Sequence, residues 1–139
     1  MSDDLEKLHA HYRETDNQFK MAGGVEGITK LANDFYNQME TLPEAKHILS
    51  LHPADLTASR EKLARFLCGY MNGPELYEEK YGPIALAPAH AHIPIGTPEK
   101  EAWLLCMEKA LDQQPYAQEF KDFILKRLSI PADRCRNRP

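Results

Sequence analysis

Helical periodicity constrains this chain more than any other feature of its sequence. After Gly23-Gly24, apolar residues recur at i, i+3, i+4, i+7 and i+11, namely Ile28, Leu31, Ala32, Phe35 and Met39. This spacing places them on one face of an amphipathic helix. No stretch alternates apolar and polar residues with the period of a β-strand. We therefore expect an all-α protein, and 139 residues are enough for one domain with its own core.

Four further stripes and their ends define the other helices. One covers residues 56–71, starts with Asp55 or Thr57 as N-cap and ends at residues 72–74, Asn-Gly-Pro. Another starts at Thr97-Pro98, with threonine as a cap and proline at the first helical position. It is apolar on most sides, so we expect it to be central. The inner residues of this helix are Trp103, Cys106, Met107, Ala110 and Leu111. A further helix follows Pro115, with Tyr116, Phe120, Phe123, Ile124 and Leu128 on its inner face. A weaker first helix carries Leu5, Leu8 and Tyr12.

These stripes divide the chain into an N-terminal extension with the first helix (residues 1–22), one domain (23–130) and a flexible basic tail (131–139). The 21 acidic and 17 basic residues give a net charge of −4, which disfavours nucleic acid as a partner. Three cysteines far apart, with no CxxC pair, fit reduced thiols in the cytoplasm. No run of 18 apolar residues exists, so no membrane partner is expected. Nucleotide-fold and serine-hydrolase motifs are absent.

The segment from Asn72 to Pro98 is too long for a plain connector in a small helical domain. It holds five of the ten prolines and three of the seven glycines, yet it also carries apolar side chains that can anchor it. We therefore expect it to hold a functional site.

Two histidines within this segment, His90 and His92, are candidate metal or haem ligands. Pro88 permits one short helical turn and Pro94 ends it. In a helical turn, residues two apart point about 200° from each other, so at most one of the two histidines can bind a given ion. Only an extended chain would let both bind, and an ordinary surface histidine is the alternative to either. The other histidines form no HExxH motif, so a zinc site has weak support.

Haem needs less from a sequence than zinc does: one axial histidine, apolar helices on both sides of the ring and a few polar groups opposite the histidine. The polar-tipped residues at the edges of the apolar stripes are Tyr36, His52, Ser59 and Trp103. Each of them could instead simply pack in the core or lie in a loop. Their occurrence together with His90 favours haem.

Taken in order, these residues resemble the truncated haemoglobin family, and within it group II. The resemblance covers roughly residues 23–111. The motifs that carry it are Gly23-Gly24, Phe35-Tyr36, Leu51-His52-Pro53, Asn72-Gly73-Pro74 with Leu76-Tyr77, His90 followed by Ile93-Pro94-Ile95-Gly96, and Ala102-Trp103-Leu104-Leu105-Cys106-Met107.

The resemblance implies a two-over-two helical sandwich around haem b (iron protoporphyrin IX), with a proximal histidine on the iron. By position, His90 is the proximal, metal-binding histidine, and Tyr36, His52 and Trp103 are the polar distal residues. Ser59 stands where conventional globins carry a distal histidine. The haem-binding residues implied are His90, Tyr36, His52, Ser59, Lys62, Leu63, Phe66, Tyr77, Ile95 and Trp103.

The sequence departs from the family pattern at two places. The family usually has arginines just before the proximal histidine, where they contact the haem propionates, and this chain has Ala87-Pro88-Ala89. Lys62 matches the other usual propionate partner, and Tyr77 or Arg60 is a candidate to assist it. Group II proteins often have tyrosine at the position of His52, so ligand binding is expected to depend more on pH here.

The resulting expectation is a haem protein that binds dioxygen and other diatomic ligands reversibly, for transport or for sensing oxidative or nitrosative load. Nitric oxide, carbon monoxide and peroxide are further candidate ligands. One alternative is a haem enzyme with peroxidase or nitric oxide detoxifying activity, supplied by a reductase. The second alternative is a haem-free helical interaction module that uses residues 72–98 as a docking loop.

Overall fold

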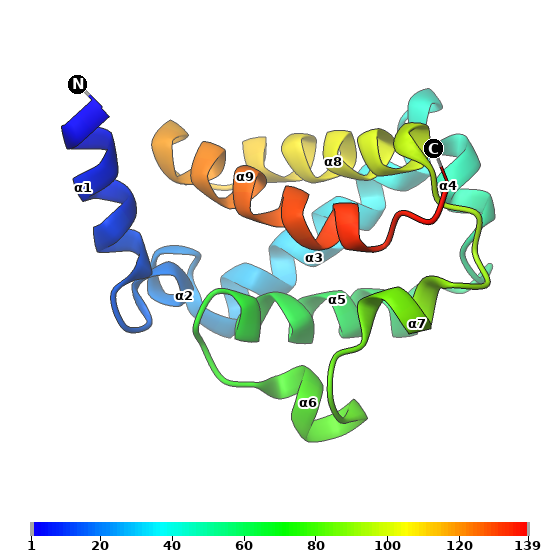
Figure 1. Cartoon of the computed structure of the whole chain (residues 1–139), viewed down its shortest axis with the longest axis horizontal. Helices are drawn as coiled ribbons and strands as arrows, with labels where there is room; N and C mark the ends of the chain where they lie inside the picture. Colours follow the sequence, from blue (N-terminus) through cyan, green and yellow to red (C-terminus); the bar gives the residue numbers. More distant parts are fainter. Residues whose placement is uncertain (1, 139) are drawn as a thin grey trace.

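The long helices of the computed structural model follow the apolar stripes of the sequence (Figure 1). The structure describes residues 2–138, and every regular element within that range is helical, which confirms the expected all-α class. The long core helices are α3 (Gly24–Thr41), α5 (Thr57–Tyr70), α8 (Thr97–Asp112) and α9 (Gln118–Arg134). The remaining elements are α1 (Ser2–Arg13), α2 (Asn17–Met21), η1 (Pro43–Ala45), α4 (Lys46–Ser50), α6 (Leu76–Tyr81) and α7 (Leu86–His90).

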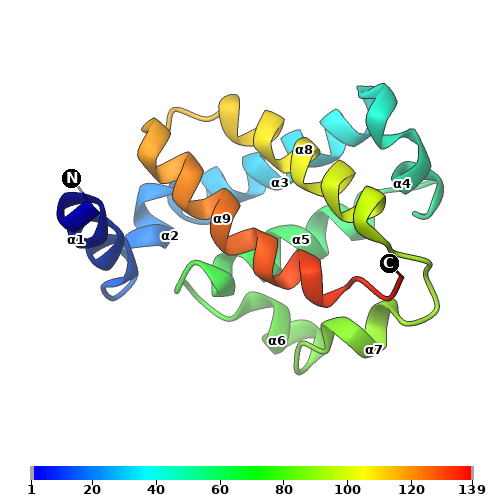
Figure 2. The same ribbon diagram turned by 45° about the horizontal axis from the view of Figure 1, so that its top comes forward.

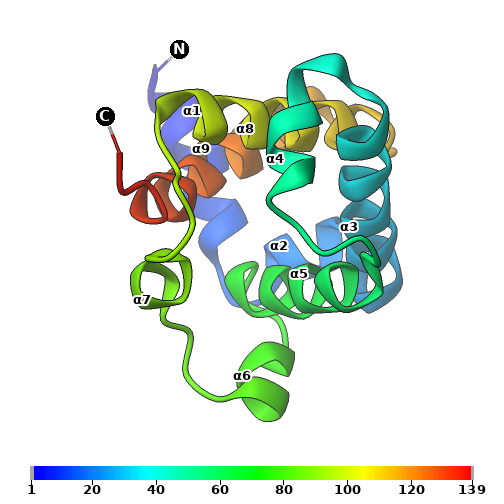
Figure 3. The same ribbon diagram turned by 90° about the vertical axis from the view of Figure 1, so that its right-hand side faces the viewer.

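Four helices form two layers of two. α3 packs against α5 and against α8, and α8 packs against α9. Figure 1 shows α8 as the uppermost and α5 as the lowest of the four long helices, and Figure 2 shows α9 running diagonally in front of α5. This arrangement is the two-over-two sandwich that the resemblance implies. The short helices α6 and α7 lie outside the two layers, beside α5 and α9 (Figure 3).

The core lies where the apolar faces of the long helices meet. The inner face of α3 is fully buried, and α8 packs against α3, α4 and α9, so the prediction of a central helix is confirmed. The buried residues that these two helices contribute include Ile28, Leu31, Phe35, Met39, Cys106, Met107, Ala110 and Leu111.

The N-terminal residues are docked on the core. The predicted first helix is two helices, because the backbone turns at Thr15, whose φ is +43°. Tyr12 of α1 is buried, and its ring centre lies 5.3 Å from that of Phe120 and 5.0 Å from that of Phe123 on α9. These aromatic contacts fix α1 against α9.

Polar groups define the starts of two long helices. Oδ1 of Asp55 accepts hydrogen bonds from the backbone N–H (2.9 Å) and the hydroxyl (2.7 Å) of Thr57, so Asp55 is the side chain that starts α5. The N-cap of α8 is Gly96 rather than the predicted Thr97, and its N–H donates to Oε1 of Glu99 at 2.7 Å. This carboxylate satisfies a backbone donor that the helix itself leaves unpaired.

The C-terminal residues differ from the expected flexible tail after residue 130. α9 continues to Arg134, because Leu128 and Pro131, one turn apart, are both buried against the core. Beyond the helix, the backbone N–H of Asn137 donates to the carbonyl of Ile95 at 2.7 Å. The chain is therefore held in place well past the predicted boundary.

The proline-rich segment between α5 and α8 contains two short helices. α7 is the single helical turn that the sequence predicts at Pro88, whereas α6 was not predicted. α6 is held to α5 through Glu61, whose Oε1 accepts from the hydroxyl of Tyr81 at 2.9 Å and pairs with Lys80. Within residues 2–138, no helix is both long and apolar enough to cross a lipid bilayer.

Candidate functional site

An open cavity of about 640 Å³ lies between α5, α7 and α9. Its walls are mainly apolar, with one cation. The residues that line it include Phe66 and Tyr70 from α5, Leu86 and Ala87 from α7, and Pro131 and Arg134 from α9. The predicted site segment therefore does border a cavity.

His90 lies at the end of α7, four residues after the cavity-lining Leu86. Its Nδ1 is 2.7 Å from the carbonyl oxygen of Leu86. A carbonyl can only accept, so Nδ1 carries the proton and the lone pair of the neutral ring is on Nε2. This is the state in which a histidine binds a metal, with its second nitrogen fixed by a backbone carbonyl.

The neighbouring histidine has a different environment. His92 is exposed and has no side-chain hydrogen bond within residues 2–138, whereas His90 is half-buried. α7 ends at His90, so His92 lies in the turn that follows the helix. Within the described part of the chain, no three side chains of the histidine, cysteine, aspartate and glutamate types lie close enough to hold a metal ion together.

Between α3, α8 and the turn after α4, four aromatic rings contact one another in series. The Tyr36 ring centre is 5.8 Å from that of His52 and 4.9 Å from that of Phe35. Phe35 is in turn 4.9 Å from Trp103. Three of the predicted distal residues, from α3, the turn after α4 and α8, are thereby brought together. Phe35 is not among the predicted site residues, although it lies in the apolar stripe of α3 and next to Tyr36 in the sequence.

Burial controls the chemistry of Tyr36. Its side chain is 6% exposed. This desolvation raises the pKa of the phenol to about 12, against smaller opposing effects of the Arg60 charge and of a hydrogen bond with Ser59. The phenol is therefore protonated at neutral pH and able to donate a hydrogen bond. Nδ1 of His52 is 2.8 Å from the carbonyl oxygen of Ile48, which leaves Nε2 of this histidine unprotonated in the neutral ring.

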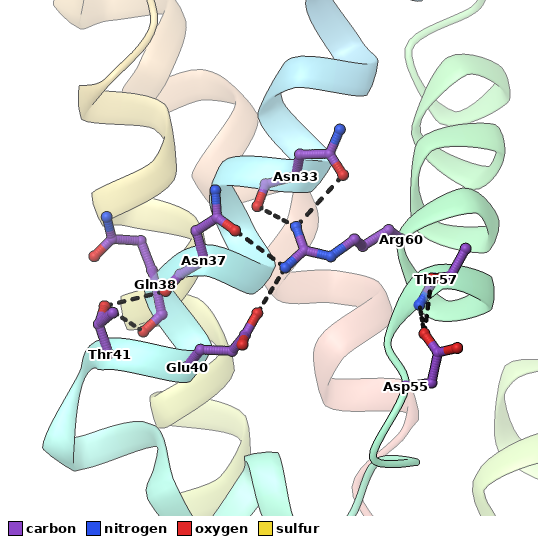
Figure 4. Close-up of polar contacts among 8 residues, drawn as sticks. All are labelled: Asn33, Asn37, Gln38, Glu40, Thr41, Asp55, Thr57 and Arg60. Carbon is purple, nitrogen blue, oxygen red and sulfur yellow. Dashed lines mark hydrogen bonds and ion pairs between the residues drawn. The ribbon is translucent and has the colours of Figure 1, made fainter.

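The two cations proposed for the haem propionates have different surroundings. The guanidinium of Arg60 donates to the Asn33 carbonyl (2.9 Å), Oδ1 of Asn37 (3.0 Å) and Oε1 of Glu40 (2.7 Å), all on α3 (Figure 4). Lys62 is exposed, with Nζ 5.3 Å from the ring centre of Tyr81, and it forms no ion pair within residues 2–138. Lys62 is thus free to meet an anion, and Arg60 is already bound to α3.

The remaining predicted site residues lie on α5, on α6 and just before α8. Leu63 and Phe66 are half-buried on α5 and pack against the core. Tyr77 lies on α6 with its ring 5.1 Å from that of Tyr81, and it is not among the residues that line the cavity. The backbone N–H of Ile95 donates to Oδ1 of Asn137 at 3.0 Å.

Two residues near His90 were missed by the sequence analysis. Sγ of Cys135 lies 3.6 Å from Nδ1 of His90, and Nδ2 of Asn137 donates to the His90 carbonyl at 3.1 Å. Both were assigned to a flexible tail. No local spacing signal connects them to a histidine more than 40 residues earlier in the chain.

Comparisons with known proteins show the family of this chain. The bacterial-like globin family model matches residues 17–137. Group 2 truncated hemoglobin YjbI of Bacillus subtilis (strain 168) is 35% identical over 109 residues, which are 78% of this chain and 80% of that protein.

Solved structures show the same fold. The group II 2-on-2 hemoglobin of Agrobacterium tumefaciens superposes with a TM-score of 0.83 at 34% identity, over 88% of this chain and 95% of that one. The truncated oxygen-avid haemoglobin of Bacillus subtilis superposes with a TM-score of 0.76 at 33% identity, over 86% and 98% of the two chains.

Proposed function

Because this chain belongs to the bacterial-like globin family, and within it to the group II truncated haemoglobins, we propose that it binds dioxygen reversibly at a haem iron held by His90. The observation that carries the proposal is the hydrogen bond from Nδ1 of His90 to the Leu86 carbonyl, which leaves Nε2 to bind iron. The reduced thiols expected of this chain fit the cytoplasm as its compartment.

The residues present fit haem b as the cofactor. A haem has two apolar faces and a carboxylate edge, and the structure offers half-exposed apolar side chains beside an open cavity. Leu63, Phe66 and Trp103 would cover the ring, and Lys62 would meet the carboxylate edge. When bound, haem supplies an iron with one open position for a diatomic ligand.

The distal residues would select among ligands by hydrogen bonding. The Tyr36 hydroxyl is protonated because burial raises its pKa to about 12, so it is a donor across the physiological range. Trp103 is half-buried, and its indole N–H has no acceptor within residues 2–138. Dioxygen accepts hydrogen bonds much better than carbon monoxide does, so these donors would favour dioxygen. The oxygen-avid character stated for the Bacillus subtilis structural relative supports this preference.

His52 favours a second function, peroxide reduction. Reducing hydrogen peroxide to two waters takes two electrons and two protons, and a histidine is suited to move protons near neutral pH. His52 is half-buried, has Nε2 unprotonated in its neutral form and lies edge-on to Tyr36. A reductase would have to supply the electrons. Nitric oxide detoxification would need the same kind of electron donor.

Two measurements on the purified protein test these functions. A Soret band that titrates reversibly with dioxygen supports the carrier function, and a protein that does not take up haem contradicts both haem functions. Steady turnover of peroxide or nitric oxide with a reductase, at physiological ligand levels, would favour the enzyme. Loss of that turnover in His52→Gln, with dioxygen binding retained, would assign the proton transfer to His52.

A further inference from the structure

We propose that the C-terminal residues 133–138, here called the strap, position His90 for iron binding. The proposal rests on the proposed function, because it concerns the histidine that holds the iron. It adds positioning residues near the C-terminal end of the chain, where the sequence predicts a flexible tail. Asn137 and Cys135 are the two side chains that carry it.

Asn137 ties down the chain that follows α7. Its Nδ2 donates to the carbonyl of His90 at 3.1 Å and to that of Ile93 at 2.7 Å. Its Oδ1 accepts from the backbone N–H of Ile95 at 3.0 Å. One amide side chain thus satisfies three backbone groups across residues 90–95, including the backbone of the histidine itself. The His90 carbonyl also accepts from the backbone N–H of Ile93 at 2.9 Å, whereas the Ile93 carbonyl and the Ile95 N–H have the Asn137 amide as their partner.

Backbone and ion-pair contacts hold the strap itself in place. The carbonyl of Ile95 accepts from the backbone N–H groups of Asn137 (2.7 Å) and Arg138 (2.9 Å). Nη1 of Arg136 donates to the hydroxyl of Thr97 at 3.3 Å, at the start of α8. Asp133 pairs with Lys100 on the same helix, 3.1 Å apart. The strap is therefore fixed to α8 as well as to α7.

Cys135 contacts the imidazole of His90 directly. Its Sγ lies 3.6 Å from Nδ1, the nitrogen that donates to Leu86 and does not bind iron. The thiol is half-buried and is not in a disulfide. Because the thiol contacts the same nitrogen that donates to the Leu86 carbonyl, it limits rotation of the imidazole away from that carbonyl.

α7 needs such support because it has little packing of its own. It is five residues long, contains no buried residue and packs mainly against α9. A single turn of this length is not stable alone. The residues before His90 are Ala87, Pro88 and Ala89, which offer no polar side chain to hold the turn. The strap supplies from elsewhere in the chain what the turn lacks.

Two variants of the holoprotein test the strap. Asn137→Leu removes three side-chain hydrogen bonds, and Cys135→Ala removes the thiol that contacts Nδ1 of His90. Arg138→Ala is the matched control, because that side chain has no hydrogen bond or ion pair within residues 2–138 and its backbone N–H is kept. The readouts are the iron–histidine stretching band of the ferrous protein in resonance Raman spectra and the rate of haem transfer to apomyoglobin.

We expect Asn137→Leu to broaden or shift the iron–histidine band and to speed haem loss about tenfold, equivalent to about 1.4 kcal/mol. Cys135→Ala is expected to shift the band with a smaller change in haem loss, and Arg138→Ala to match the wild type. Circular dichroism melting separates these effects from global unfolding. If Asn137→Leu does not fold, the band position in Cys135→Ala decides.

Other results would count against the strap. A wild-type band and wild-type haem loss in Asn137→Leu, together with an unshifted band in Cys135→Ala, would overturn it. If the wild type still shows an iron–histidine band that His90→Ala lacks, the proposed function survives that result. A wild type that takes up haem without any iron–histidine band would overturn both.

Discussion

The two sides of the candidate haem site are built in different ways. Tyr36 lies on α3 beside the fully buried Phe35, and Trp103 lies on α8 one turn before the fully buried Cys106 and Met107, so their positions follow from core packing. The proximal histidine lies on a five-residue helix with no buried residue and is held by hydrogen bonds from the C-terminus. The comparison teaches that distal geometry depends on apolar packing and proximal geometry on a few polar contacts.

The largest effect is expected on the proximal side. His90→Ala should abolish stable iron coordination, whereas His92→Ala should leave it nearly intact. Of these two histidines, His90 is the one whose Nδ1 is fixed by a backbone carbonyl. His92 is the matched control, since it is the same residue type two positions away. Visible spectra and bound-iron analysis of the purified variants measure the difference. Equal haem loss in both variants, or loss only in His92→Ala, would contradict the assignment.

The next largest effect is expected on the distal side, at the two donors. A hydrogen bond to a charged or strongly polar ligand is worth about 1.5–3 kcal/mol, so Tyr36→Phe or Trp103→Phe should speed dioxygen release about 10- to 150-fold. Carbon monoxide release should change much less. Stopped-flow dissociation of both gases is the measurement.

A matched variant separates these donors from ordinary core residues. Tyr12→Phe removes the same hydroxyl from α1, outside the distal cluster, and should leave both gases unchanged. If Trp103 acts only in packing, Trp103→Phe will lower the free energy of unfolding by roughly 1–3 kcal/mol and shift both gases alike. Parallel shifts, or none, would leave the distal donors without support.

A smaller effect is expected in the pH dependence of stability. The pKa of Tyr36 is about 12 in the folded protein because its phenol is buried, against an ordinary value of 10.0. The unfolded chain loses this proton first, so the contribution of Tyr36 to stability is complete below pH 10 and is lost as the pH rises toward 12. At pH 11 the loss should be about 1.4 kcal/mol.

Urea unfolding at pH 8, 10 and 11 checks this expectation. Tyr36→Phe has no phenol to titrate, so its free energy of unfolding should fall less with pH than that of the wild type. Tyr116 has a pKa raised to about 12 by burial as well, and it is present in both proteins, so the difference isolates Tyr36. Identical pH dependence of the two proteins would rule out a buried, protonated Tyr36.

The contrast between apolar packing on the distal side and polar contacts on the proximal side explains which parts of the site could be predicted from the sequence. α3, α5 and α8 were predictable because apolar spacing reports which helix face is buried, and that burial also positions Tyr36 and Trp103. The single turn before His90 was predictable from Pro88 and Pro94. The strap was not, because the hydrogen bonds of Asn137 join residues 42, 44 and 47 positions apart. Its three arginines look like a solvated tail, and periodicity carries no information about such distant polar contacts.

The smallest effect is expected at the edge between the two sides, where a cation would meet the haem carboxylates. Lys62 and Arg60 lie two residues apart on α5, but only Arg60 is bound to α3, through Asn33, Asn37 and Glu40 (Figure 4). The contribution of Arg60 is therefore expected to be to stability rather than to haem retention. An exposed ion pair is worth about 0.2–1 kcal/mol.

Lys62→Ala should therefore speed haem transfer to apomyoglobin about two- to fivefold, because these energies correspond to rate changes of that size. Arg60→Ala should leave haem transfer close to the wild-type rate while lowering the urea midpoint, since it breaks four hydrogen bonds to α3. The pair of variants thus separates a contact with the haem carboxylates, expected for Lys62, from the contact of Arg60 with α3. Unchanged haem loss in Lys62→Ala would mean that another cation meets the carboxylates, and Arg134 at the rim of the cavity would then be the residue to replace next.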